Sequence, residues 1–132
     1  VFFNRFKDEH IDVVVGIESR GFIFAAPLAL RLGVRFVLAR KPGKLPSEVV
    51  KQEYQLEYGS DAIELHKDAI AHSDKVLIID DLLATGGTAR ATGDIVKKLG
   101  GEIISYAFLI SLNFLDGHEM LTPDSVFSII EY

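Results

Sequence analysis

Residues 76–88 read VLIIDDLLATGGT, and the expected fold is organised around this stretch. Its first four residues, 76–79, are all apolar, which is typical of a strand buried on both faces in the middle of a parallel sheet. Two adjacent carboxylates, Asp80 and Asp81, follow where that strand is expected to end. After a loop of small residues, a helix is predicted whose inner face carries Thr92, Ile95, Val96 and Leu99. Because ligands of open α/β sheets bind at the carboxyl ends of strands, and helix N-termini attract phosphate, the stretch predicts an anion-binding site.

The composition is that of one domain, residues 1–132, with a single core, since 48% of the 132 residues are apolar. The chain has no cysteine, no recognisable signal peptide and no apolar run near the length of a membrane span, so we expect a cytoplasmic protein with no membrane partner. The net charge of −5 argues against non-specific nucleic-acid binding. The charged residues between 31 and 51 are nevertheless mainly basic, which suits either a compact polyanion such as a phosphate ester or a solvated loop.

The other predicted elements alternate between strands and helices. Residues 22–32 form an apolar run too long for a strand, so we expect a helix there, with Ser19 as its N-cap and Gly33 just past its end. Residues 49–58 and 62–66 alternate between apolar and polar residues, which predicts a projecting, flexible β-hairpin, antiparallel and polar on one face. Buried strands are expected at 12–17 and 34–39, and two further strands at 102–110 and 126–130. The expected fold is α/β, with a five-stranded, mainly parallel sheet flanked by helices.

The loop after the acidic pair allows two interpretations. Its small residues let backbone N–H groups approach an anion closely, and its threonines add hydroxyl donors. Because it lacks the lysine of a Walker A motif, and no GxGxxG occurs in the chain, it suits a phosphate monoester better than a nucleoside triphosphate or a dinucleotide. Otherwise it is a tight turn in which Thr88 caps the helix. The residues concerned are Ala84, Thr85, Gly86, Gly87 and Thr88.

Asp80 and Asp81 also allow two interpretations. Adjacent carboxylates after a buried strand repel each other, so fold stability does not require them. They suit sugar hydroxyls, a divalent cation or a developing positive charge. The alternative is a pair at a helix entry that the helix dipole favours.

Two further segments follow predicted strands, at the same edge of the sheet if the strands are parallel. The segment ESRG at 18–21 could hold a second anionic group through its backbone and Arg20, or could simply begin a helix that carries a surface arginine. Arg40, Lys41 and Lys44 follow the next strand and suit either a mobile clamp for a polyanion or a solvated basic loop.

The sequence resembles the type I phosphoribosyltransferases. Residues 76–88 are similar to the phosphoribosyl diphosphate motif of that family. The segments ESRGF at 18–22, RKPGKLP at 40–46, LEYG at 56–59 and DLLATGGT at 81–88 occur in the order seen in its adenine-specific group, so the resemblance covers nearly the whole chain. It implies the type I phosphoribosyltransferase fold and an enzyme that converts adenine and phosphoribosyl diphosphate into AMP and pyrophosphate. Mg²⁺ and a homodimer are implied as well.

The resemblance also implies roles for the matching residues. The loop from Ala84 to Thr88 would bind the 5′-phosphate, while Asp80 and Asp81 would hold the ribose hydroxyls and stabilise an oxocarbenium-like transition state. Pyrophosphate would be bound by residues of two segments, some of them across a dimer interface: Ser19, Arg20, Arg40, Lys41 and Lys44.

A catalytic acid is implied on the hairpin. Alternation alone places Glu57 on the exposed face of the hairpin, as one polar residue among several. The resemblance instead makes Glu57 the acid near N7 of the purine, with Tyr58 beside it. Residues 41–66 would then form a mobile catalytic loop and hairpin, because a cationic ribosyl centre must be shielded from water.

Residues 105–114 indicate which purine base the chain binds. A 6-oxopurine needs a donor facing O6, but residues 105–114 contain no lysine or arginine; the N6 amine of adenine needs an acceptor, which a backbone carbonyl can provide. A transferase for another purine, such as xanthine, and a non-catalytic phosphoribosyl diphosphate-binding regulator are the alternatives. Members of the family carry a further N-terminal segment that contacts the base. We therefore expect an N-terminally truncated chain that keeps the phosphate-binding core and binds adenine poorly.

Overall fold

A five-stranded parallel sheet forms the centre of the molecule, as predicted. A computed structural model describes residues 1–56 and 59–132. The sheet has the order β2-β1-β5-β6-β7, and every neighbouring pair is parallel. Its strands are β1 (Val13–Ile17), β2 (Arg35–Ala39), β5 (Lys75–Leu83), β6 (Glu102–Ser111) and β7 (Val126–Glu131).

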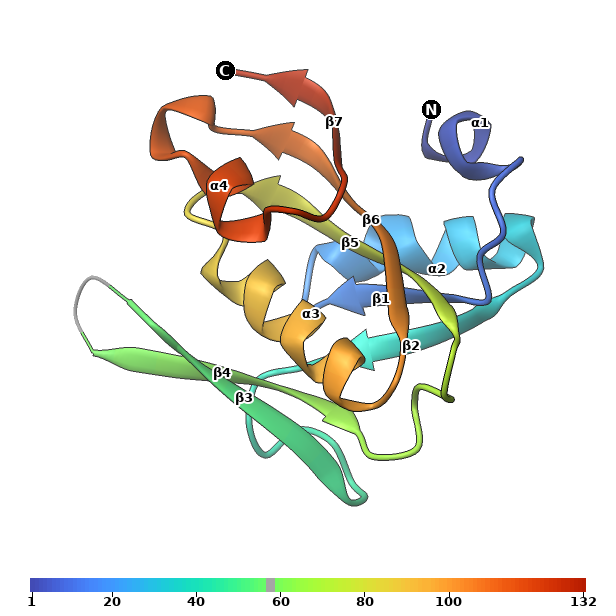
Figure 1. Cartoon of the computed structure of the whole chain (residues 1–132), viewed down its shortest axis with the longest axis vertical. Helices are drawn as coiled ribbons and strands as arrows, with labels where there is room; N and C mark the ends of the chain where they lie inside the picture. The colour runs from blue at the N-terminus through green and yellow to red at the C-terminus, as the bar shows by residue number, and fades with distance from the viewer. Residues whose placement is uncertain (57–58) are drawn as a thin grey trace.

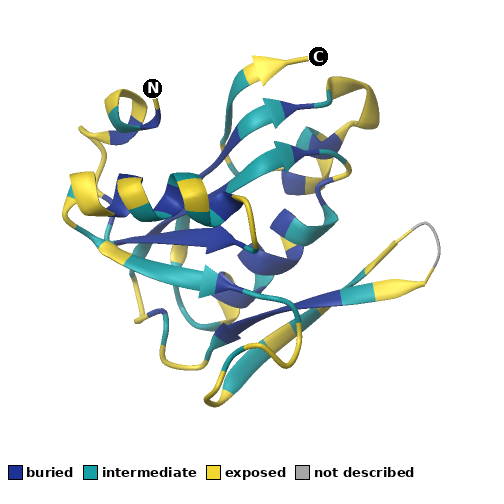
Figure 2. Cartoon of the chain, turned by 180° about the vertical axis from the view of Figure 1, so that it is seen from behind, coloured by how far each residue is buried: buried dark blue, intermediate teal, exposed yellow. Residues whose placement is uncertain are grey.

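Helices cover both faces of the sheet (Figure 1). Helix α2 (Gly21–Leu32) packs on one face and α3 (Gly87–Lys98) on the other. Successive residues of β1 alternate between the two cores: Val14 packs on the α2 side, whereas Val13 and Val15 pack on the α3 side. This alternation explains why the central strands read as unbroken apolar runs, and Figure 2 shows β1 buried throughout. Short helical segments, α1 (Phe2–Phe6), η1 (Asn113–Leu115) and α4 (Gly117–Leu121), complete the fold, and the last two were not predicted.

The strand order reverses between β1 and β5. The chain leaves β1 through α2 to reach β2 on one side, and leaves β5 through α3 to reach β6 on the other. Such a reversal opens a crevice at the carboxyl ends of the two strands, where ligands of α/β sheets bind. The pairing of β1 with β5 ends at Gly16 and Ile79, whereas β5 remains paired with β6 as far as Leu83.

The acidic pair therefore lies inside β5, which corrects the expectation that the strand ends before it. Asp80 pairs with Phe108 of β6 and has no partner on β1. Carboxylates are tolerated at this point of the strand because the sheet is already open on their β1 side.

The hairpin is formed by β3 (Val49–Gln55) and β4 (Ser60–His66), which pair antiparallel as predicted. Its far end extends away from the sheet in Figure 1. The expectation of one polar face was wrong at the base, where residues 62–65 are all buried, Glu64 included. Both strands pack against α3, so the base of the hairpin is part of the core.

Two local expectations were also wrong. β2 is an edge strand that exposes Arg35, not a strand buried on both faces. Helix α2 begins at Gly21 with Arg20 at the N-cap position, and no side chain, Ser19 included, caps it. Gly33 ends the helix in the left-handed conformation, with φ of 72°, as expected of a glycine there.

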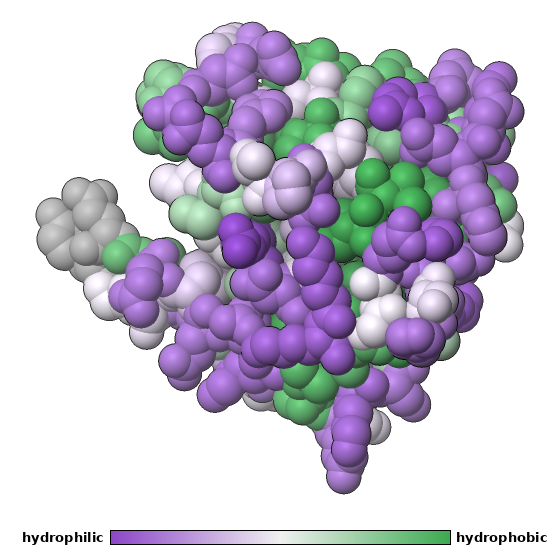
Figure 3. All heavy atoms as spheres, in the orientation of Figure 1, coloured by the Kyte–Doolittle hydropathy of each residue, from purple (hydrophilic) through white to green (hydrophobic). Residues whose placement is uncertain are grey.

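The surface on the face shown in Figure 3 is mainly hydrophilic, with separate hydrophobic areas. No helix within 1–56 and 59–132 has the length and apolar character needed to cross a membrane.

Candidate active site

Two adjoining pockets lie at the carboxyl ends of β1 and β5. The loop pocket is lined by the residues of the 84–88 loop and by residues from the hairpin, β5, α3 and β6: Tyr54, Gln55, Leu56, Asp80, Leu82, Leu83, Ala84, Thr85, Gly86, Gly87, Thr88, Ala89 and Phe108. The basic pocket is lined by Ile17, Glu18, Ser19, Arg20, Lys41, Asp80, Asp81, Leu82 and Thr88. Asp80, Leu82 and Thr88 belong to both, so the pockets form one continuous site.

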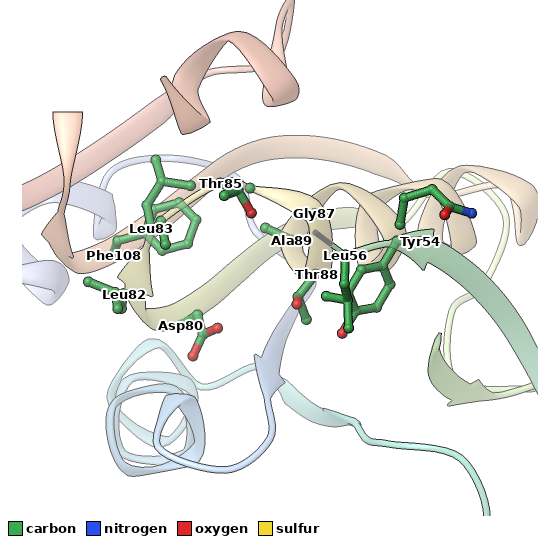
Figure 4. A pocket seen from close by; sticks show the side chains of 13 residues that line it. Tyr54, Leu56, Asp80, Leu82, Leu83, Thr85, Gly87, Thr88, Ala89 and Phe108 are labelled. Atoms are coloured by element: carbon green, nitrogen blue, oxygen red, sulfur yellow. The ribbon is translucent and has the colours of Figure 1, made fainter. Parts of the chain in front are cut away.

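One end of the loop pocket is an apolar wall. Figure 4 shows Tyr54 and Leu56 of the hairpin beside Gly87 and Thr88, with Leu82 and Phe108 at the other end. Phe108 is buried, so its ring forms a fixed apolar wall. An apolar wall next to a ring of small polar residues suits a flat, partly polar ligand joined to an anion.

The loop presents the N-terminus of α3 to the pocket. Gly86 is the N-cap, with φ of 88°, and no side chain caps the helix. Thr88 lies inside the helix, so the interpretation of Thr88 as a cap is excluded. The first amide groups of an α-helix have no partner within it, and the dipole adds positive potential there. These groups and the threonine hydroxyls can bind a phosphate.

Gly86 is needed for packing as well as for its backbone conformation. A Cβ at this position would lie 2.9 Å from the Gly117 carbonyl oxygen and 2.9 Å from Cβ of Met120, both in α4. Helix α4 thus supports the loop from behind.

Replacing Gly86 by Ala should therefore displace the loop and raise the KM for the phosphate-bearing substrate about tenfold or more, because a misplaced anion loses hydrogen bonds from several donors. Steady-state kinetics measures the change. Gly33→Ala is the matched control: Gly33 also has positive φ, but a Cβ there meets nothing within 4 Å. It should cost about 1 kcal/mol of stability and leave KM unchanged. An unchanged KM in Gly86→Ala contradicts the role of the loop.

The acidic pair is held in a defined geometry. The Asp81 N–H donates to Oδ1 of Asp80 at 2.8 Å, and Nε of Arg20 lies 2.7 Å from Oδ2 of Asp81. Gly21 lets α2 approach β5 closely, since a Cβ there would lie 3.1 Å from Oδ1 of Asp80. Burial raises the pKa of Asp80 to about 8; the Asp81 N–H lowers that pKa, and the Asp81 carboxylate raises it.

The raised pKa of Asp80 makes stability depend on pH. Between about pH 4 and pH 8 the folded chain keeps a proton that the unfolded chain has lost, so stability falls as pH rises through this range. Asp80→Asn removes this effect. Between pH 5 and pH 8 the free energy of unfolding of the wild type should therefore fall by about 3 kcal/mol relative to that of Asp80→Asn, with allowance for partial solvent access.

Urea unfolding at both pH values tests this expectation. Asp12→Asn is the control, because the Lys75 N–H holds the pKa of Asp12 below its ordinary value and Asp12 stays charged over this range. The difference in free energy of unfolding between Asp12→Asn and the wild type should be the same at both pH values. Parallel curves for Asp80→Asn and the wild type would show that Asp80 is ionised in the free protein.

The four predicted anion-binding cations are all paired with carboxylates of the same chain. Arg20 pairs with Asp81. Arg40 and Lys44 both pair with Glu18, Arg40 at 3.3 Å. Lys41 pairs with Asp61 of the hairpin at 2.6 Å.

The structure brings most of the predicted site residues together. Ser19, Arg20, Lys41, Asp80, Asp81 and the loop residues from Ala84 to Thr88 all line the two pockets. Arg40 and Lys44 do not line them and instead contact Glu18. The predicted catalytic acid Glu57 and its neighbour Tyr58 lie outside the described residues.

Sequence reasoning missed Glu18 and the apolar wall. Glu18 follows β1 directly, at the same strand end as Ser19 and Arg20, and that position was the available signal. Leu82 and Leu83 were missed because β5 was expected to end before them. Phe108 lies in the strand predicted at 102–110, but only the pairing of β6 with β5 brings it to the pocket.

Comparison with known proteins defines the class. The model of the phosphoribosyl transferase domain family matches residues 2–130. The chain belongs to the phosphoribosyltransferase family. Within that family it resembles adenine phosphoribosyltransferases: the protein of Anaeromyxobacter dehalogenans (strain 2CP-1 / ATCC BAA-258) is 53% identical over 131 residues, which cover 99% of this chain and 76% of the relative.

Solved structures agree with this assignment. The adenine phosphoribosyltransferase of Thermoanaerobacter pseudethanolicus superposes with a TM-score of 0.95 at 48% identity, covering 99% of this chain and 77% of that one. The enzyme of Saccharomyces cerevisiae, solved in complex with adenine and an imino-altritol bisphosphate, gives a TM-score of 0.90 at 46% identity, with 96% and 72% covered. The type I phosphoribosyltransferase fold is thereby confirmed.

Proposed function

We propose that this chain transfers the phosphoribosyl group of phosphoribosyl diphosphate to adenine, giving AMP and pyrophosphate in purine salvage. The observation that carries the proposal is the pair of pockets joined at Asp80, one with a helix N-terminus and an apolar wall, the other with cations. A phosphate and a base fit the first pocket, a diphosphate fits the second, and the ribose spans the acidic pair between them. The relatives named above act on adenine or are complexed with it.

Each part of the site has a distinct task in this reaction. Residues 84–88 hold the 5′-phosphate and so orient C1 of the ribose. Arg20 and Lys41 attract the leaving diphosphate, whose negative charge grows as its bond to C1 breaks. Asp80 and Asp81 accept hydrogen bonds from the ribose hydroxyls and stabilise the positive charge that develops on the ring. Glu57 stays the predicted acid at N7, on the strength of the resemblance alone.

The residues of the site also fit Mg²⁺ that is held mainly by the substrate. Within the described ranges no group of three or more His, Asp or Glu side chains could hold a metal ion. Mg²⁺ commonly binds through one or two carboxylates together with substrate phosphates, and Asp80 and Asp81 offer two. When bound, it neutralises charge on the diphosphate. Loss of turnover in a chelator and its return with added Mg²⁺ tests this dependence.

We also propose a homodimer. Ile23 and Leu30 lie two turns apart on α2 and are 66% and 82% exposed, an apolar face that a second copy can cover. Sedimentation equilibrium measures the oligomeric state, and a monomer at assay concentration contradicts this proposal. A cytoplasmic location, the absence of a nucleic-acid partner and the mobility of residues 41–66 stay predictions.

A competition between bases tests the proposed function. With phosphoribosyl diphosphate and an equal mixture of adenine, hypoxanthine, guanine and xanthine, AMP should be the main nucleotide, because no lysine or arginine occurs in residues 105–114 to donate to O6. Formation of mainly IMP, GMP or XMP would assign the chain to another base. Tight binding of phosphoribosyl diphosphate without any nucleotide product would make it a regulator.

A further inference from the structure

Glu18 is the centre of a hydrogen-bonding cluster, and the reaction described above gives Glu18 itself no direct part. It follows β1 immediately, and its own N–H donates to the Ala39 carbonyl oxygen at 2.9 Å. Its side chain is only 10% exposed. The carboxylate accepts the Lys41 N–H at 2.8 Å and Nε of Arg40 at 3.3 Å, and it also accepts Nζ of Lys44. One largely buried carboxylate thus accepts hydrogen bonds from three residues of the basic loop, which comprises residues 40–44.

The loop residue that faces the site is Lys41. Its backbone is held by Glu18, and its ammonium donates to the hydroxyl of Tyr54 at 2.7 Å and to Oδ2 of Asp61 at 2.6 Å. These contacts place Lys41 at the wall of the basic pocket, beside Arg20. The side chain is 36% exposed, so an anion can reach it.

Glu18 also lines the pocket into which a diphosphate would bind, although a carboxylate repels an anion. Its charge is already neutralised by the loop. Burial raises the pKa of Glu18, but the hydrogen bonds from Lys44 and the Lys41 N–H outweigh burial and bring that pKa below its ordinary value. The carboxylate is therefore ionised at neutral pH and committed to the loop, not to the substrate.

We propose that Glu18 is a positioning residue for diphosphate recognition: by binding the Lys41 N–H together with Arg40 and Lys44, it fixes the basic loop so that Lys41 faces the basic pocket. The inference rests on the proposed function and names the device that makes its diphosphate site. Glu18 acts through Lys41 and touches no reacting atom.

The variant Glu18→Gln tests the role of the charge. Its amide oxygen can still accept the Lys41 N–H, but the uncharged group no longer neutralises Arg40 and Lys44. The KM for phosphoribosyl diphosphate should rise roughly tenfold, as expected for weakened charge-assisted hydrogen bonds, with kcat within about twofold of the wild type and the KM for adenine unchanged. The Kd of pyrophosphate, measured by calorimetry in the presence of Mg²⁺, should rise by a similar factor.

Asp74→Asn is the matched control. Asp74 is also a partly buried carboxylate that accepts a backbone N–H, from Ala71 at 2.8 Å, and pairs with an arginine, Arg35. It precedes β5 and so lies at the amino end of the sheet, away from both pockets. Loss of the Asp74 carboxylate should lower the melting temperature without changing the KM for phosphoribosyl diphosphate or for adenine. A rise in KM for this variant too would show that Glu18→Gln acts through general destabilisation, and would overturn the proposal.

A double-mutant cycle separates positioning from direct contact. Lys41→Met should itself raise the KM for phosphoribosyl diphosphate, and adding Glu18→Gln to it should change KM less than about threefold further, because the residue through which Glu18 acts is gone. Fully multiplicative effects would show that Glu18 acts independently of Lys41 and overturn the proposal. A lower KM in Glu18→Gln alone would also overturn it, since Glu18 would then compete with the diphosphate for the cations.

The same measurements distinguish a failure of the proposed function from a failure of the role proposed for Glu18. If the wild type forms no AMP and binds no pyrophosphate, the function is wrong. If the wild type does both and Glu18→Gln matches it, only the role of Glu18 is wrong.

Discussion

Replacing Asp80 and Asp81 together by Asn is expected to lower kcat about a thousandfold, while the Kd of pyrophosphate changes by less than about threefold. The two carboxylates lie where the loop pocket meets the basic pocket, next to the expected position of the ribose. The negative charge of the pair, which Asp81 carries beside Arg20 and to which Asp80 adds once it loses its proton, matters most when positive charge develops on the ribosyl ring. Asn keeps the size and some hydrogen bonds but removes that charge.

Stability measurements separate this loss from unfolding. Asp80→Asn should stabilise the chain at pH 8, because burial of the wild-type carboxylate is unfavourable once it ionises. If Asp80→Asn alone loses turnover while being more stable than the wild type, that loss is not due to unfolding. Asp124→Asn, which breaks the ion pair with Lys97 at 2.9 Å, is the control for loss of a carboxylate and should keep its kcat. Turnover of the double variant within tenfold of the wild type would remove the acidic pair from catalysis.

The second large effect is expected in the core, at Gly93 of α3. A Cβ on Gly93 would lie 1.9 Å from the hydroxyl oxygen of Tyr106, and 3.0 Å from Cδ1 of Ile103, both in β6. Tyr106 is fully buried, so its ring cannot move away without disturbing the packing between α3 and the sheet. Gly93→Ala should therefore reduce the free energy of unfolding by about 3 kcal/mol in urea titrations, despite the higher helix propensity of Ala.

Tyr106→Phe provides the complementary test. The Tyr106 hydroxyl finds no hydrogen-bond partner among the described residues, and burial raises the pKa of the phenol above its ordinary value. Removing it should leave stability unchanged or raise it by about 1 kcal/mol, because an unsatisfied buried polar group is lost. The same change should also restore part of the stability lost in Gly93→Ala. Equal losses for Gly93→Ala in both backgrounds would show that the hydroxyl contact is not the cause.

The parts of the fold that were predicted are those encoded by local patterns. Apolar runs located the central strands, and Gly33 located the end of α2. The extension of β5 to Leu83 was not predicted because it depends on pairing with β6, which continues after β1 has ended. The burial of Glu64 was missed for a similar reason: alternation shows that a hairpin has two faces, but not that α3 covers its base.

In the candidate site, too, features that are local in the sequence were predicted and contacts between distant segments were not. The loop and the acidic pair were predicted correctly as neighbours because they are contiguous in the sequence. The ion pairs were not, since Glu18 lies 22 positions from Arg40 and 26 from Lys44, and only the fold brings them together. Arg40 and Lys44 were therefore expected at the anion, whereas they contact the carboxylate that holds their loop.

The most direct test of the central claim is turnover by the chain itself. With adenine, phosphoribosyl diphosphate and Mg²⁺, AMP and pyrophosphate should form in equal amounts. Replacing adenine by hypoxanthine should lower the rate more than about a hundredfold, because residues 105–114 contain no lysine or arginine to donate to O6. Absence of AMP, or equal rates with the two bases, would contradict the account.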